Sequence, residues 1–345
     1  MLHQFSLIER ALLKFDVIPH PFVDAASSVG LGYALAAAVK LGIVDHVGAA
    51  PRAAEDIAKA AGTSAVGTRL ALDCLDALGY VTQSAAGYAF TKRGLKHLAK
   101  DAPESFRYFI LFCDYLYKGY GQLDETIRLG KRRQGSMLDE MDEAGWELFS
   151  RAMIEISRTN LKEVAGLVAV PSGAKSILDV GGSHGQYSME LCRRHPNVTA
   201  TVLDLPPVRR YADECIKRDG MTARVAFVEG NFELDDLPGT HDVILAFNIV
   251  HGLDEAGCQS LFAKAFRALR PGGTLAVLDQ IKGTGGSTQL AKATTSYMAL
   301  NLLHQAGGRT YTAAELGEFA RVAGFTASRL RKLNSPGFGV VNCSK

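Results

Sequence analysis

The sequence lacks the patterns that would tie it to a membrane, a disulfide framework or a nucleic acid. No hydrophobic run approaches the roughly 20 residues that a membrane-spanning helix needs. The six cysteines include no CxxC pair and show no regular spacing, which argues for reduced thiols rather than disulfides or a zinc knuckle. Lysines and arginines number 38 against 36 aspartates and glutamates, and a net charge of +2 gives no electrostatic reason to expect binding to nucleic acid or acidic lipid.

What is present is an ordinary globular composition in a chain long enough for two domains. The 345 residues are 47% hydrophobic and 21% charged, and a single core of that length is uncommon. The opening stretch MLHQFSLIERALLKF carries charges and does not predict a signal peptide. We therefore expect a cytoplasmic protein.

Residues 30 to 100 carry the pattern of three helices and a hairpin. GYALAAAVKLGIVDHV predicts the first helix. AAEDIAKAAG and SAVGTRLALDCLDALG predict two more, ended by Gly62 and Gly79, with Ser64 as the N-cap of the third. YVTQ and YAFT predict two strands around SAAG, which completes a winged helix. The third helix offers one arginine, two aspartates and a long apolar stripe, which favours dimerisation over DNA binding.

The rest of the chain changes character at Lys175. Residues 101 to 170 predict helices with aromatic clusters, most of which we assign to core packing. From Lys175 on, strands such as SILDV, TATVLDL, VAFVEG, HDVILAFNIV and TLAVLD alternate with helical segments. This alternation predicts an α/β fold with a doubly wound, mostly parallel sheet. Ligands of such sheets bind at the carboxyl ends of the strands, where every motif considered below falls.

The loop ILDVGGSHG joins the first of these strands to its helix. Gly181, Gly182 and Gly185 permit a tight turn and a close approach of the backbone to a ligand. Asp204 ends the next strand, 25 positions after Asp179, where it can bind a ribose diol. The order is GGxxG rather than GxGxxG, which favours a nucleoside with a short charged tail over a dinucleotide.

These motifs resemble the S-adenosylmethionine-dependent small-molecule O-methyltransferase family from about residue 30 to the end. DVGGSHG, LDLP, EGNF and ALRPGG are similar to the family's DVGGGxG, FDLP, GDxF and LRPGG. The resemblance implies a winged-helix dimerisation domain at residues 1–100, a helical connector at 101–170 that contributes to the substrate pocket, and a Rossmann-like catalytic domain at 171–345. It also implies a homodimer that acts on a small molecule and binds neither nucleic acid nor membrane.

The resemblance assigns cofactor contacts residue by residue. It implies that Gly181 approaches the methionine part of S-adenosyl-L-methionine and that Asp204 holds the ribose hydroxyls, with Leu205 beside the adenine. Asn231 and Phe232 would flank the adenine. The family usually has an aspartate where Asn231 stands, and an amide can still pair with the adenine edge.

The same resemblance places the reacting groups. FSRAMIEIS is similar to the family's FxxxMxxxS helix, which implies Met153 in the substrate pocket and Ser157 near the cofactor carboxylate. His251, in NIVHGLDE, stands where the family has its general base, and Asp279 stands where an acidic residue orients that base.

Two departures bear on the reaction. The family's HDW reads HGL here, and its GGxERT reads GGRTYT, with Thr310 in the acidic position. The base therefore keeps one acidic neighbour, which suffices more easily for a phenol than for an alkyl alcohol. The leading prediction is O-methylation of an aromatic hydroxyl, with His251 as general base and no metal.

Two alternatives stay open from the sequence. His304, in YMALNLLHQAGG, falls where the substrate pocket is expected, and paired with His251 it would form a divalent-metal site. Such a site resembles the branch of the family that C-methylates 2-oxo acids. The second alternative is a protein that binds the cofactor without methyl transfer, against which the presence of both His251 and Asp279 argues.

Overall fold

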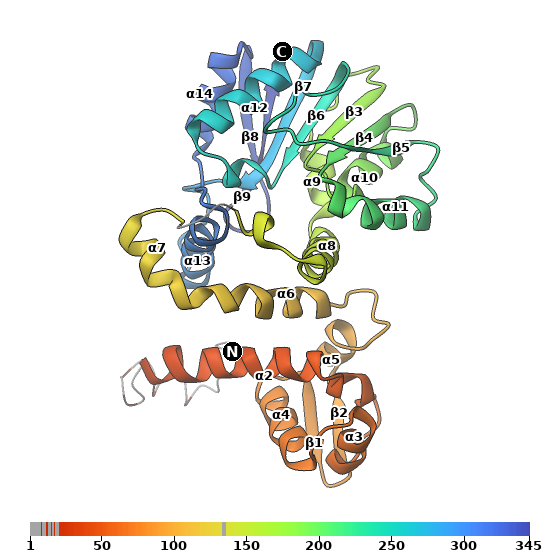
Figure 1. The fold of residues 1–345 in the computed structure, drawn as a ribbon, viewed down its shortest axis with the longest axis vertical. Helices are drawn as coiled ribbons and strands as arrows, with labels where there is room; N and C mark the ends of the chain where they lie inside the picture. The colour runs from red at the N-terminus through yellow and green to blue at the C-terminus, as the bar shows by residue number, and fades with distance from the viewer. Residues whose placement is uncertain (1–7, 9–11, 13–14, 16, 18–20, 133–135) are drawn as a thin grey trace. The chain divides into compact units, whose positions relative to one another are not determined.

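The computed structural model describes residues 21–132 and 136–345, together with the single residues 8, 12, 15 and 17. The chain divides into two compact units, residues 1–118 and 119–345, which are coloured along the chain in Figure 1. Among the described residues, no helix combines the length and the apolar character needed to cross a membrane.

The first unit contains the helices and the hairpin that the sequence predicts. Ser64 caps α4 by accepting a 3.0 Å hydrogen bond from the Gly67 amide. Gly62 and Gly79 follow α3 and α4 in the left-handed region, with φ of 67° and 74°. The helices are α2 (Ser28–Lys40), α3 (Ala54–Ala61), α4 (Ala65–Ala77), α5 (Lys92–His97) and α6 (Arg107–Tyr117), preceded by the π-helix η2 (Phe22–Ser27), and the antiparallel strands are β1 (Val81–Ser84) and β2 (Gly87–Phe90).

The first predicted helix is shorter than its pattern indicates. We expected it to run through GYALAAAVKLGIVDHV, but α2 ends at Lys40. Gly42 takes a left-handed φ of 68°, and the chain continues as the 3₁₀ turn η3 (Ile43–His46). Ile43, Val44 and Val47 pack into the core through that turn, so periodicity alone did not reveal the break.

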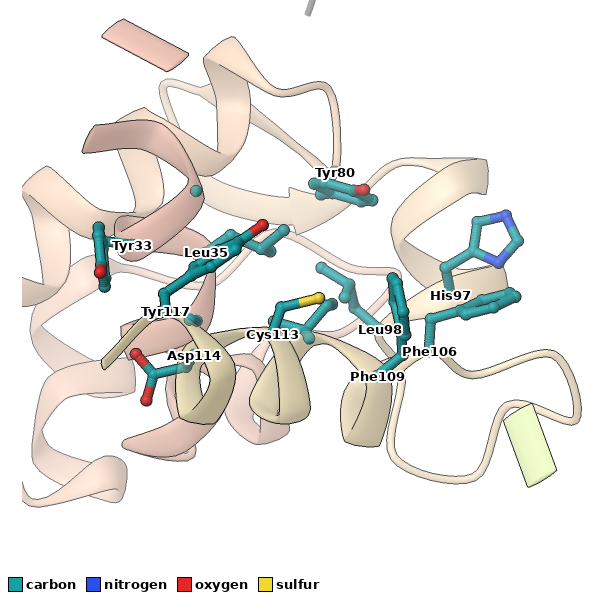
Figure 2. Close-up of a pocket in the computed structure, with 13 residues that line it drawn as sticks. Tyr33, Leu35, Tyr80, His97, Leu98, Phe106, Phe109, Cys113, Asp114 and Tyr117 are labelled. Carbon is teal, nitrogen blue, oxygen red and sulfur yellow. The ribbon is translucent and has the colours of Figure 1, made fainter. Parts of the chain in front are cut away.

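A cavity of about 360 Å³ lies within this unit, between α2 and α6 (Figure 2). Several aromatic side chains that we assigned to the core line it instead, among them Phe106, Phe109 and Tyr117. Tyr117 meets Tyr33 of α2 edge to face, with ring centroids 6.0 Å apart. Burial raises the pKa of the Cys113 thiol, which also lines the cavity, to about 11.

The second unit is built on a seven-stranded sheet in the order β5-β4-β3-β6-β7-β9-β8. The first five strands in that order are parallel, and β9 runs antiparallel to its neighbours β7 and β8, so the sheet is mostly parallel as predicted. The strands are β3 (Ser176–Val180), β4 (Thr199–Asp204), β5 (Val225–Glu229), β6 (His241–Phe247), β7 (Leu269–Gln280), β8 (Ala327–Lys332) and β9 (Phe338–Ser344).

Helices cover both faces of this sheet (Figure 1). Alternate residues of each central strand serve opposite cores: Ile177 packs with α9, α10 and α11, and Leu178 with α12 and α14. The helices of this unit are α7 (Leu123–Leu129), α8 (Glu143–Ser157), α9 (Leu161–Leu167), α10 (Gln186–Arg194), α11 (Arg209–Arg218), α12 (Glu255–Ala268), α13 (Gln289–Ala306) and α14 (Ala313–Ala323), with short turns η4 (Lys118–Gln122), η5 (Met137–Glu140), η6 (Pro206–Val208) and η7 (Val250–Gly252).

The predicted site residues follow the carboxyl ends of the parallel strands. β4 ends at Asp204 itself, and Asp279 is the next-to-last residue of β7. His251 is not the strand-end residue that we expected, because β6 stops at Phe247 and His251 lies four positions later, in η7. Helix α12 then begins at Glu255, and the side chain of Asp254 caps it by accepting from the Gly257 amide.

Candidate active site

The loop between β3 and α10 can adopt its path only because of its glycines. Gly181 has a φ of 64°, and a Cβ there would lie 2.6 Å from Cγ2 of Ile249. Gly182 lies directly over Asp179, where a Cβ would sit 2.6 and 2.9 Å from the two carboxyl oxygens. A loop this close to a strand presents its backbone, rather than side chains, to a ligand.

Asp204 holds the same loop from the neighbouring strand. Its Oδ2 accepts a 2.8 Å hydrogen bond from the Ser183 amide, and its Oδ1 accepts one of 2.7 Å from the Leu205 amide. Burial raises the pKa of Asp204 to about 6, although both amide hydrogen bonds act to lower it. Each oxygen keeps a second lone pair, with which the carboxyl group can accept the hydroxyls of a bound sugar.

Asp179, beneath the loop, is less well satisfied. Its side chain is 1% exposed, and Oδ2 accepts a 2.7 Å hydrogen bond from the Ser188 hydroxyl. Oδ1 has no hydrogen-bond partner. Burial raises the pKa of Asp179 to about 7; the Ser188 hydrogen bond opposes this rise, and the negative charge of Asp204 adds to it.

A cavity of about 90 Å³ opens between this loop and α8. His184 connects the loop to α8. It hydrogen-bonds the backbone of Met153 on α8, and its Nδ1 accepts from the Gln186 amide at 3.1 Å. Burial lowers the pKa of His184 to about 4, so the ring is neutral at pH 7. The cavity is lined by Phe149, Met153, Ile156, Ser157, Asp179, Gly181, Gly182, Ser183, His184, Tyr187, Phe247 and Asn248.

Three of the predicted residues, Met153, Ser157 and Gly181, therefore meet at one cavity although they come from two segments. Ser157 is 2% exposed, and its hydroxyl donates to Oε1 of Gln186 at 2.7 Å. Its remaining lone pair is the group it can offer to a ligand.

Asn231 and Phe232 lie one strand further along the same edge. The amide of the preceding Gly230 donates to the backbone carbonyl of Asp204 at 3.1 Å, which fixes the turn after β5 beside β4. Oδ1 of Asn231 accepts from the Glu233 amide at 2.9 Å, so its amide hydrogens are the groups it can offer to a base. Lys264 holds the Phe232 carbonyl at 2.8 Å.

His251 and Asp279 form a directed pair. Nδ1 of His251 lies 2.7 Å from Oδ1 of Asp279, and the His251 amide donates to Oδ2 at 3.2 Å. Because the carboxylate accepts at Nδ1, the proton lies on that nitrogen, and Nε2 is left with a free lone pair. Burial lowers the pKa of His251, but the charge of Asp279 and the hydrogen bond to it outweigh burial, so the pKa lies above its usual value.

Gly308 lies directly against the backbone of His251. A Cβ on Gly308 would lie 2.7 Å from the His251 carbonyl carbon and 2.8 Å from Cα of Gly252, so no side chain fits there. Thr310 stands at the position where the family has an acidic residue. It lines a separate cavity of about 230 Å³ together with Gln280. No carboxylate lines that cavity.

His304 is engaged at both ring nitrogens. Nδ1 pairs with the Thr126 hydroxyl at 2.8 Å, and Nε2 lies 3.0 Å from the Gly119 carbonyl. Because a carbonyl only accepts, Nε2 carries the proton, and Nδ1 accepts from Thr126. The Tyr120 ring packs against it edge to face at 5.2 Å. His304 thus has no free lone pair for a metal, and within the described part of the chain no group of three His, Cys, Asp or Glu residues is arranged to hold one.

The sequence did not single out three residues that line the loop cavity. Asp179 was noted only as the start of a motif, and His184 not at all. Asn248 is one of two non-glycine residues with positive φ among the described residues, at 55°; Ser183 is the other, at 47°. For Asp179 the sequence offered one signal, an acidic residue two positions before a glycine pair in DVGG. The positions of His184 and Asn248 depend on backbone geometry, which the sequence did not reveal.

Comparisons with known proteins identify the family of the chain. Residues 135–326 match the model of the O-methyltransferase domain, and residues 24–100 match that of the O-methyltransferase dimerisation domain. A 3-hydroxy-5-methyl-1-naphthoate 3-O-methyltransferase of Streptomyces sahachiroi is 29% identical over 326 residues, which is 92% of this chain and 93% of that protein. A 3-amino-4-hydroxybenzoate 4-O-methyltransferase of Streptomyces cremeus is 31% identical over 288 residues, 79% of this chain and 75% of that one. The structure of human N-acetylserotonin methyltransferase in complex with SAM aligns with a TM-score of 0.81 at 21% identity, covering 100% of this chain and 99% of the other.

Proposed function

This chain belongs to the S-adenosylmethionine-dependent O-methyltransferase family, and from that premise we propose that it methylates the hydroxyl of a small aromatic acceptor. Two relatives are named for acceptors that are a hydroxynaphthoate and a hydroxybenzoate, which supports an aromatic hydroxyl here. The observation that carries the proposal is the hydrogen bond between His251 and Asp279, which leaves Nε2 of the histidine free to accept a proton.

In the proposed mechanism His251 removes the proton of the acceptor hydroxyl. A neutral hydroxyl is a weak nucleophile, so the base must act as, or before, the oxygen attacks. Asp279 fixes the tautomer of His251 and stabilises the imidazolium that forms. The bound cofactor supplies an electrophilic methyl group on a sulfonium sulfur. The proton ends on Nε2 and leaves to solvent.

The chain has a set of groups that fits this cofactor. The backbone at Gly181 lines the loop cavity, where a methionine tail can approach it. Asp204 offers two carboxyl oxygens to the ribose hydroxyls, and the amide of Asn231 offers donors to the adenine edge. Ser157 lines the same cavity and, with its hydroxyl proton given to Gln186, offers a lone pair.

An aromatic acceptor suits the single acidic partner of the base. A phenol has a pKa of about 10, several units below that of an alkyl alcohol, so a histidine with one carboxylate neighbour can deprotonate it. Thr310 and Gln280 line a cavity that contains no carboxylate, so Thr310 does not replace the second acidic partner. We therefore propose a phenol rather than an alkyl alcohol as the acceptor.

We also propose that the enzyme works as a homodimer in the cytoplasm and does not use its winged helix to bind nucleic acid. The dimerisation-domain match supports the dimer. On α4, Val66 and Leu70 are 72% and 60% exposed, one helical turn apart, as a protein interface requires. Arg69 between them pairs with Glu55 instead of standing free for a phosphate. All six cysteines are free thiols, in keeping with a reducing compartment.

The test is a transfer assay with methyl-labelled S-adenosylmethionine and two acceptor panels, phenols and 2-oxo acids, each with and without a chelator. We expect label on a phenolic oxygen, at a rate that the chelator does not change. Transfer to carbon of a 2-oxo acid that the chelator abolishes would overturn the proposal. Cofactor binding without transfer to either panel would indicate a protein that binds the cofactor only.

A further inference from the structure

The cavity of about 230 Å³ in the second unit has no part in the methyl transfer as proposed above. Its walls are the end of β7 with the loop that follows, the inner side of α13, and two residues from later loops. The lining residues are Gln280, Ile281, Lys282, Gly283, Gly285, Thr295, Ser296, Ala299, Thr310 and Gly337.

Several polar groups on these walls have hydrogen-bonding capacity that the chain does not use. Gln280 is 6% exposed, yet within the described residues its side-chain amide makes no hydrogen bond. The hydroxyls of Ser296 and Thr310 make none in that part of the chain either, whereas the Thr295 hydroxyl donates to the Ala291 carbonyl at 2.8 Å. A buried amide of this kind is costly unless an occupant of the cavity serves as its partner.

The charge on the walls favours an anion as that occupant. Lys282 is the one charged residue among those that line the cavity, and it is exposed. Its ammonium group forms no ion pair with any described residue, and its flexible four-carbon stem lets the charge reach a ligand. One cation with neutral donors matches the single charge of a carboxylate, whereas a phosphate would bring up to two charges and three strong acceptors.

The remaining walls and the volume suit an aromatic ring. Ile281 is 2% exposed, and Ala299 adds a second apolar side chain. A Cβ on Gly285 or on Gly337 would lie 2.8 or 2.6 Å from Cγ2 of Thr295, so both loops approach this methyl group closely. Because an apolar cavity of about 150 Å³ can hold benzene, about 230 Å³ has room for a benzene ring that carries a carboxylate.

We propose that this cavity is a binding site for a small aromatic carboxylate. The ring packs against Ile281 and Ala299, and the carboxylate accepts hydrogen bonds from the Gln280 amide and is balanced by Lys282. Two sources can supply such a ligand: an acceptor with a carboxylate on its ring, or a second aromatic acid bound apart from the acceptor. The first source deepens the proposed function and rests on it, whereas the site itself rests on the cavity alone.

Benzoate is the probe, and methyl NMR of the full-length protein without cofactor measures its binding. Ile281, Thr295 and Ala299 carry methyl groups on the walls, so their resonances should shift during a benzoate titration. Benzamide has the same ring without the charge and should bind about 10-fold more weakly, because it forms no charge-assisted hydrogen bond. Equal affinity for the two ligands, or a titration that leaves these resonances in place, would overturn the inference.

The variants separate the charge from the buried donors. Lys282→Gln should weaken benzoate about 2- to 5-fold, a modest loss because the ammonium is exposed to water. Lys282→Arg should keep the affinity, and Lys292→Gln, exposed on α13 outside the cavity, is the matched control. Gln280→Met keeps the length of the side chain but removes its donors, and it should weaken benzoate about 10- to 100-fold.

The comparison of Lys282→Gln with Lys292→Gln involves two exposed residues, so it decides the question even if Gln280→Met does not fold. The same benzoate affinity in these two lysine variants would contradict the proposed site.

Steady-state kinetics identifies the source of the carboxylate. If the acceptor's own carboxylate occupies the cavity, Lys282→Gln should raise KM for a hydroxybenzoate about 2- to 5-fold, with kcat and the KM of a neutral phenol unchanged. If a second acid binds apart, benzoate should not compete with the acceptor, and Lys282→Gln should leave both KM values unchanged. Benzoate binding without methyl transfer to any acceptor would reject only the proposed function. Methyl transfer without benzoate binding would reject only this inference.

Discussion

Asp179 on β3 and Asp279 on β7 are aspartates at the same edge of one sheet, and each is 1% exposed. Asp279 accepts three hydrogen bonds from its own chain, from Nδ1 and the amide of His251 and from the amide of Gln280. Asp179 accepts one, from Ser188. Equal burial therefore gives different chemistry: one carboxyl group orients a base, and the other lacks the partner that a ligand can supply.

His251 and His304, both in the second unit, differ in the same way. His251 uses one ring nitrogen for Asp279 and keeps the other free. His304 uses both nitrogens to join α13 to Thr126 and Gly119. Free hydrogen-bonding capacity, rather than residue type or position along the sequence, separates a reacting group from a structural one.

The largest effect should come from His251→Ala. Without the base, turnover should fall about 10²–10⁴-fold, while the affinity for S-adenosylmethionine stays near that of wild type. Calorimetry and initial rates on the identified acceptor measure the two. Turnover equal to that of the wild type in this variant would show that His251 takes no part in catalysis.

Asp279→Asn should cost less, about 10²-fold in kcat/KM, because the histidine remains but loses the charge that stabilises its protonated form. In the wild type, activity falls as pH drops through the raised pKa of His251, since the protonated ring cannot accept a proton. The variant should move this acid limb to lower pH. Glu255→Gln, just past the same turn, is the control and should leave the limb in place.

Asp204→Ala should weaken S-adenosylmethionine binding by about 1.5–3 kcal/mol, as the loss of charge-assisted hydrogen bonds would. Its effect should appear in affinity more than in the rate at saturation. Glu233→Ala, exposed at the same edge of the sheet, is the matched control. Unchanged affinity in Asp204→Ala would place the cofactor elsewhere.

The smallest effect on the chemistry should come from His304. His304→Ala should lower the free energy of unfolding by about 1–3 kcal/mol, because it leaves the Gly119 carbonyl and Thr126 without their partner. His304→Gln, which can restore one of the two bonds, should lose less. Neither variant should make turnover sensitive to a chelator. A wild-type enzyme that a chelator inactivates, and that His304→Ala damages as severely as His251→Ala, would revive the metal site.

Local signals predicted the parts of the fold that local chemistry decides. Gly62, Gly79 and Ser64 ended or capped the helices that we assigned to them, and the alternation after Lys175 gave the sheet and its ligand edge. The break at Gly42 was missed, because the apolar pattern continues through a turn that also packs into the core.

The site was predictable where one motif supplies the residue, and less so where packing decides its state. The pairing of His251 with Asp279 follows from two neighbouring strand ends. The engagement of His304 depends on Thr126, 178 positions away, and no periodicity could reveal it. The unpaired oxygen of Asp179 depends on the path of Gly182 above it, which is equally a matter of tertiary structure.

The most direct test of the central claim is a series of ring-substituted versions of the identified acceptor with falling phenol pKa. If His251 acts as the base, the ratio of wild-type to His251→Ala turnover should shrink as the phenol becomes more acidic, and it should approach one for a phenol already ionised at the assay pH. A large ratio that stays constant across the series would contradict the account, because His251 would then serve something other than proton removal.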